Sequence, residues 1–183
     1  MRLFQVYAIA GGKALALALV VCIYTALAGL IELFAVNAAT GYMPPHPAAA
    51  LAYLCLIALV MLAAAAAVAT RLSSITSGVV ALLLFRFAWM GGIAQSVGSF
   101  YGNGGIRDAG TLTQLLFPSD VMWRSAVFQL QPEAFTSTLA GAHAWTGPFF
   151  VTAAPPTATT IWTICWIAVV CVLGARHFAT RDL

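Results

Sequence analysis

The sequence predicts an all-α integral membrane protein with four transmembrane helices, and two observations predict this class. Of the 183 residues, 62% are hydrophobic and only 7% are charged, whereas about a quarter of the residues of a soluble domain are charged. The charged residues also leave four long apolar tracts between them, each near the length of about 20 residues that a helix needs to cross a bilayer. A chain this rich in apolar residues is not a disordered one either.

The four apolar tracts follow one another along a single domain, residues 1–183. We place the first two at about 14–36 and 48–68, and the last two at about 76–97 and 157–173. Threonines dilute the last tract, although Trp162 and Trp166 restore apolar surface to it. A cleaved signal peptide is the alternative for the first tract. Its apolar stretch is longer than the core of a signal peptide, which favours an uncleaved span.

Basic residues are distributed unevenly between the two sides of this bundle. The side that holds both termini carries five of them: Arg2, Lys13, Arg71, Arg176 and Arg181. The opposite side carries two, Arg107 and Arg124. Because cytoplasmic segments are enriched in Lys and Arg, we predict that both termini are cytoplasmic. We expect a multi-pass protein of the plasma (cytoplasmic) membrane with the segment 98–154 on its outer side.

The outer segment 98–154 is too long for a plain connector. Pro118 and Asp120 are typical of a helix start, with Asp120 as the cap of a helix over 121–130. Asp120 and Arg124 are four residues apart and can pair on one face, while Trp123 adds apolar surface. We expect a short amphipathic helix at the outer interface. A plain loop that covers the bundle is the alternative.

Arg86 is the one charge deep inside a predicted span. A charged side chain at the bilayer centre costs at least ~2.5 kcal/mol, so we expect Arg86 to face the bundle interior or a partner, in a translocation or packing site. Its candidate partners are Gln95 and Glu32, which lies near the outer end of the first span. In the alternative, the span is shifted or tilted and the Arg86 side chain snorkels to the interface.

No group of residues in the sequence points to catalysis or to a bound metal. All four cysteines fall inside predicted spans, away from the aqueous loops where reactive thiols act. The histidines, His46, His143 and His177, lie in three separate segments and share no helical face. The sequence has no Gly-rich phosphate loop and no nucleophile elbow. We expect no catalytic, cofactor-binding or metal-binding residues, and no nucleic-acid partner.

Four short motifs follow one another in order along the chain. The first runs from Arg2 to the Gly12-Lys13 entrance of the first span, and the second is the Ser/Thr-rich inner loop 71–77. The third is the proline-led segment 117–120 in the outer region. The last is the C-terminal motif with Phe178, Arg181 and Asp182. In this order, the four motifs resemble those of type-two ABC transporter permeases. The segment from Pro118 to Arg124 is similar to the subgroup associated with maturation of copper enzymes such as nitrous-oxide reductase.

This resemblance covers nearly the whole chain but corresponds to only the last four of the six spans usual in such permeases. It implies a homo- or hetero-dimer of permease subunits worked by a cytoplasmic ABC ATPase subunit, which would hydrolyse the ATP. Arg2, Gly12 and Lys13 would then form the ATPase-side contact. The competing hypothesis is a small accessory or scaffold protein that binds another membrane complex without an ATPase. A secondary transporter is disfavoured because no acidic residue lies at mid-span.

Overall fold

The computed structural model describes residues 2–134, 151 and 153–179, and every regular element in these ranges is an α-helix. The all-α prediction is therefore confirmed. The helices are α1 (Arg2–Thr40), α2 (Pro47–Ala69), α3 (Ser74–Phe100), α4 (Gly104–Leu116), α5 (Ser119–Leu130) and α7 (Thr157–Ala179).

Four of these helices are long and apolar enough to cross a membrane, which confirms the predicted number of spans. The qualifying stretches are 11–40, 47–69, 74–100 and 157–176. Each is longer than its predicted span because a helix can continue past the apolar tract that identifies it. The clearest case is α1, whose 39 residues extend over about 58 Å. That is nearly twice the hydrocarbon thickness of about 30 Å.

Local signals explain where the helices begin and end. The Ser73 side chain accepts a hydrogen bond from the Thr76 backbone N–H (3.3 Å), and the Asn103 side chain does the same for Ile106 (3.3 Å). These are N-caps that satisfy free N–H groups in the first turns of α3 and α4. Gly41 and Gly102 adopt positive φ angles of 70° and 67° just after α1 and α3, a conformation that glycine adopts at little cost.

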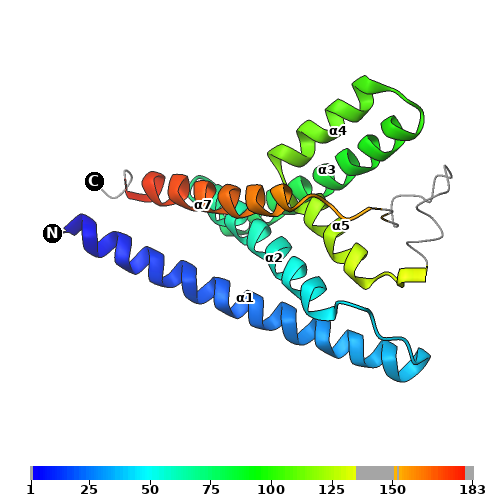
Figure 1. The fold of residues 1–183 in the computed structure, drawn as a ribbon. Helices are drawn as coiled ribbons and strands as arrows, with labels where there is room; N and C mark the ends of the chain where they lie inside the picture. Colours follow the sequence, from blue (N-terminus) through cyan, green and yellow to red (C-terminus); the bar gives the residue numbers. More distant parts are fainter. Residues whose placement is uncertain (1, 135–150, 152, 180–183) are drawn as a thin grey trace.

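The four long helices run back and forth, so α1 begins and α7 ends on the same side of the molecule (Figure 1). We call this side the termini end and the opposite side the hairpin end. Helix α2 occupies the centre and packs against α1, α3, α5 and α7. The hydrophobic core lies around α2 and α3 and contains Val60, Ala64, Ala88 and Phe117.

Helices α4 and α5 form a hairpin that enters the bundle from the hairpin end (Figure 1). Helix α4 runs antiparallel along α3, and three glycines bring the two backbones together. A Cβ atom on Gly110 would lie only 2.5 Å from the Gln95 nitrogen and the Gly91 oxygen. A Cβ on Gly98 would overlap the Arg107 backbone, and one on Gly91 would overlap the Thr113 side chain. The close fit of α4 against α3 therefore requires glycine at these positions.

The turn of this hairpin reaches the middle of the bundle. Phe117, between α4 and α5, is buried in the same cluster as Val60 and Ala88. Val60 lies about 20 Å along α2 from Pro47, and Ala88 about 21 Å along α3 from Ser74. Helix α5 then returns to the hairpin end, where Leu130 contacts Tyr42 in the α1–α2 loop. We call residues 104–130 the re-entrant hairpin.

Candidate functional site: a buried polar network in the re-entrant hairpin

The re-entrant hairpin contains a buried ion pair. Arg124 Nε lies 2.8 Å from Asp120 Oδ2, and the two side chains are only 17% and 2% exposed. The predicted pairing of these residues is confirmed, and so is a helix over 121–130. The predicted role of Asp120 as N-cap is wrong, because α5 begins at Ser119 and Pro118 occupies the cap position. Asp120 lies in the first turn, where its carboxylate turns toward α3 and α4.

Asp120 also connects α5 to α4. Gln114 Nε2 donates to Asp120 Oδ2 (2.9 Å) and lies 3.0 Å from Gln95 Oε1 on α3. Each of the three helices therefore contributes a side chain to one network. The Asp120 carboxylate also touches the α3 backbone at Gly92, where a Cβ atom would overlap it. Gly92 thus makes room for the carboxylate.

The Arg124 guanidinium fixes α5 to α3. Its Nη1 donates to Ser96 Oγ (3.0 Å) and its Nη2 donates to the Gly92 carbonyl (2.6 Å). Ser96 Oγ in turn donates to the same carbonyl (3.1 Å). A buried charge needs this kind of complete pairing, because a buried ion left without its partner costs about 3–5 kcal/mol. We conclude that the Asp120–Arg124 pair holds the hairpin in one register against α3.

Two tryptophans of α7 bind the turn of the hairpin. Trp162 Nε1 donates to the Leu115 carbonyl (3.1 Å), and Trp166 Nε1 donates to the Leu116 carbonyl (2.9 Å). The last carbonyls of a helix have no partner within it, and in lipid such groups must be satisfied inside the protein. The Trp166 ring also packs edge-on against Phe117, with centroids 5.5 Å apart. The Ser119 Oγ is buried there without a hydrogen-bond partner in the described structure.

The C-terminal end of α5 is held by the α1–α2 loop. The Tyr42 hydroxyl donates to the Leu130 carbonyl (2.8 Å). Partial burial raises the pKa of this hydroxyl above its ordinary value. One residue later, the side-chain amide of Gln131, with its nitrogen facing the Val151 carbonyl, donates to that carbonyl (2.9 Å) and accepts from the Val151 N–H (3.3 Å).

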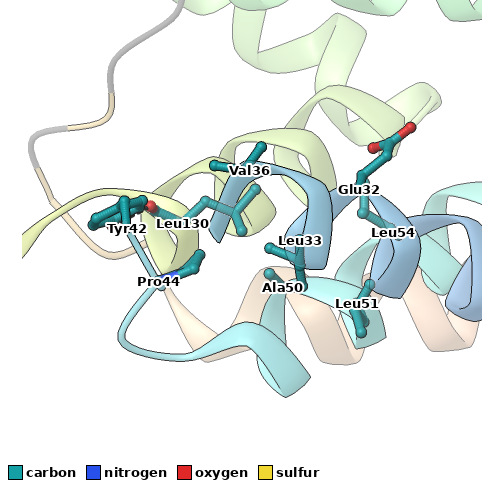
Figure 2. A pocket seen from close by; sticks show the side chains of 10 residues that line it. Glu32, Leu33, Val36, Tyr42, Pro44, Ala50, Leu51, Leu54 and Leu130 are labelled. Carbon is teal, nitrogen blue, oxygen red and sulfur yellow. Dashed lines mark hydrogen bonds between the residues drawn. The ribbon is translucent and has the colours of Figure 1, made fainter. Parts of the chain in front are cut away.

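A mainly apolar cavity of about 240 Å³ lies below this loop, between α1, α2 and the end of α5 (Figure 2). Tyr42 and Leu130 lie at one end of the cavity, and Glu32 and Leu54 lie at the other (Figure 2). Glu32 makes no hydrogen bond or ion pair to other described residues. Glu32 contributes to one end of the cavity wall, but its carboxylate points away from the other lining side chains (Figure 2).

The structure does not bring Arg86, Gln95 and Glu32 together. Gln95 belongs to the polar network, Glu32 lines the cavity, and Arg86 lies on the exposed face of α3. Trp123 is partly exposed on α5.

The residues of the two terminal motifs have separate locations. Arg2 lies in the first turn of α1, and Gly12 and Lys13 are exposed further along it. Phe178 lies in the last turn of α7. His143, Arg181 and Asp182 lie outside the described residues, as does most of the outer segment beyond residue 134.

The network residues Gln114, Ser96 and Gly92 were not predicted from the sequence, and neither was the role of the two tryptophans. Among the described residues, no three His, Cys, Asp or Glu side chains gather where they could hold a metal ion. No family model, curated protein or solved structure matches this chain.

Proposed function

We propose that this chain is a membrane-spanning permease subunit, or part of one, of an ATP-driven ABC transporter. It moves an unidentified substrate when coupled to a separate ATPase subunit. The re-entrant hairpin is the observation that carries the proposal. Segments that enter a bilayer and turn back at mid-depth are features of channels and transporters, where protein or a polar cavity satisfies their backbone.

The buried polar network also supports this proposal. Polar groups inside a membrane are costly, so they mark functional sites by default. A simple anchor or scaffold needs no buried ion pair such as Asp120–Arg124. The network joins α3, α4 and α5 into one unit, which would move together in the proposed transport cycle. Alternating access requires two conformations of the bundle that differ in their affinity for the nucleotide-loaded ATPase. A group of helices that moves together can produce two such conformations.

The termini end is the proposed contact for the ATPase. Helix α1 is about 58 Å long and continues beyond a bilayer thickness. It exposes Gly12 and Lys13, and Arg2 lies at its start. The charge distribution favours a cytoplasmic location for this end and a location on the outer side of the plasma membrane for the hairpin end. The outer turns of α5, with Trp123, would then lie at the outer interface, while Pro118 and Asp120 lie deeper.

Purification in a mild detergent tests the proposal. The chain, carrying an affinity tag, is expected to co-purify with a soluble nucleotide-binding subunit and to show ATPase activity. The Lys13→Glu variant should lower the recovery of this subunit at least severalfold, because it reverses a charge at the proposed contact. Lys13→Arg is the matched control and should retain it. Recovery of a membrane complex without any nucleotide-binding chain would contradict the proposal and favour an accessory or scaffold protein.

A further inference from the structure

Arg86 occupies an unusual position on the outside of the bundle. It lies about 18 Å along α3 from Ser74 and about 21 Å from Phe100, close to the middle of the span. Its side chain is exposed and makes no hydrogen bond or ion pair to any described residue. Large apolar side chains surround it on the same exposed side of α3. We call this surface the Arg86 face: Ile75, Val79, Leu82, Leu83, Arg86, Phe87 and Met90.

Lipid alone is an unfavourable environment for this charge. Ionisable side chains in membrane spans almost always face the bundle interior or a polar cavity, or pair with an opposite charge. Arg86 does none of these within the described residues. The interior side of α3 is filled instead by Ala81, Ala88 and Gly92, which pack against the neighbouring helices. An acidic group from outside this bundle is therefore needed to pair with Arg86.

A second copy of the chain does not supply that group at the right depth. Glu32 is the only acidic residue in the four described spans. Glu32 lies beside Ala50 of α2. The part of α3 next to Arg86 packs near Val60, further along α2. These levels are about 15 Å apart along α2. A two-fold axis along the membrane normal keeps each residue at its own depth, so Arg86 of one copy would not reach Glu32 of the other.

The composition of the Arg86 face also argues against a water-filled path. Apart from Arg86, its exposed side chains are aliphatic, aromatic or methionine. An aqueous path for a polar molecule needs more polar groups than this surface offers. A bulky apolar stripe with a single central charge suits contact with another membrane helix that carries one complementary charge.

We propose that the Arg86 face binds a separate membrane-spanning helix that carries an Asp or Glu at mid-depth. The carboxylate pairs with Arg86, and the apolar residues of the face pack along the partner helix. This inference is independent of the ATPase contact, because Arg86 lies in the middle of α3 and the Arg86 face includes no residue of α1. Failure of one proposal therefore leaves the other unaffected.

Synthetic helices in vesicles test the charge recognition directly. The purified full-length chain is placed in phosphatidylcholine vesicles with a labelled Leu/Ala transmembrane peptide that has one central Glu, and association is measured by energy transfer. The wild-type chain should bind this peptide about tenfold more tightly than Arg86→Gln does, the size expected for one polar contact in a membrane. A peptide with central Gln is the control and should not distinguish the two chains. Equal binding of the Glu peptide to both chains would overturn the proposal.

Photo-crosslinking in the native membrane tests for the partner itself. A photoreactive residue at Phe87 should capture a membrane protein with an acidic residue at mid-span, and one at Val172 on α7 is the exposed control. Arg86→Glu should abolish the capture, and replacing the partner's acid with Lys should restore it. Crosslinking mainly to a second copy of this chain, or no dependence on Arg86, would overturn the proposal. Because Arg86 makes no hydrogen bond or ion pair within the described residues, Arg86→Gln should leave the thermal stability of the chain unchanged.

Discussion

Two ion pairs with similar geometry differ in environment within the re-entrant hairpin. Arg124 and Asp120 are 2.8 Å apart and nearly buried, whereas Arg107 and Asp108 are 3.2 Å apart with side chains 56% and 69% exposed. An exposed pair contributes little because water screens it. A buried pair has lost its hydration, so removal of either partner leaves an uncompensated charge. Burial, rather than distance, makes the Asp120–Arg124 pair important for the fold.

Arg124→Ala should therefore lower the free energy of unfolding by about 3–5 kcal/mol. The matched control, Arg107→Ala, should change it by less than about 1 kcal/mol. Reversible unfolding in detergent, followed by circular dichroism, measures both. The double variant with Asp120→Ala should lose less than the sum of the two single losses, since it leaves no unpaired charge. Equal effects of Arg124→Ala and Arg107→Ala would show that the network does not hold the hairpin.

The two indole donors of α7 give a second test at the residue scale. Trp166→Phe keeps an aromatic ring near Phe117 but removes the donor to the Leu116 carbonyl. A buried carbonyl without a partner costs about 1–3 kcal/mol, so the melting temperature should fall. Trp123→Phe is the control, because the Trp123 indole donates no hydrogen bond within the described residues. A larger loss for Trp123→Phe would contradict the assigned role of Trp166.

At the scale of elements, the hairpin depends on how closely α4 approaches α3. Helix α4 has few large apolar residues, and the side that meets α3 carries Gly110 and Gln114. Its position is therefore set by backbone contact and by polar pairing rather than by a large apolar surface. Association of helices in a membrane relies on this kind of close packing, since lipid gives no hydrophobic driving force between them.

Gly110→Ala should displace α4, because the added Cβ would overlap the backbone of Gly91 and Gln95. Overpacking of this kind costs about 1–3 kcal/mol. Gly78→Ala is the matched control on α3, where nothing lies within 4 Å of the added atom. It should be neutral or slightly stabilising, since Ala favours a helix over Gly. Proteolysis of the 101–103 turn gives a local readout, and equal rates in the two variants would contradict this account.

The sequence predicts the four spans well because hydropathy is a local property of each tract. It also predicts α5 and the Asp120–Arg124 pair, because a helix start and a four-residue spacing are local as well. Helix α4 was missed because the glycines at 102, 104 and 105 resemble a loop. The partners Gln114, Ser96 and Gly92 come from other helices, so only tertiary packing brings them to the ion pair. The Asn103 cap and the glycines 91, 98 and 110 were the available signals for a packed hairpin.

At the scale of the whole molecule, some helices of the bundle are tightly packed together and others leave large surfaces exposed. Helices α2, α3, α4 and α5 are extensively packed together, whereas α1 lies at the edge of the bundle against α2 and, at fewer positions, α7 (Figure 1). Many large side chains of α1 and α7 are exposed, including Ile31, Phe34 and Ile161. These surfaces suit lipid or further subunits. The packed part contains the re-entrant hairpin, so the hairpin is distinct from the exposed surfaces of α1 and α7.

Accessibility of single cysteines tests the re-entrant hairpin most directly, and with it the observation that carries the proposed function. In a variant without the four native cysteines, a membrane-impermeant thiol reagent is applied to intact and to permeabilised cells. Tyr101→Cys and Glu133→Cys should react from outside, and Leu72→Cys only after permeabilisation. Leu116→Cys, exposed at the turn of the hairpin, should react from neither side because it faces lipid at mid-depth. Reaction of Leu116→Cys from outside would place the hairpin on the surface, and reaction from the cytoplasm would make it a full span; either result would contradict the account.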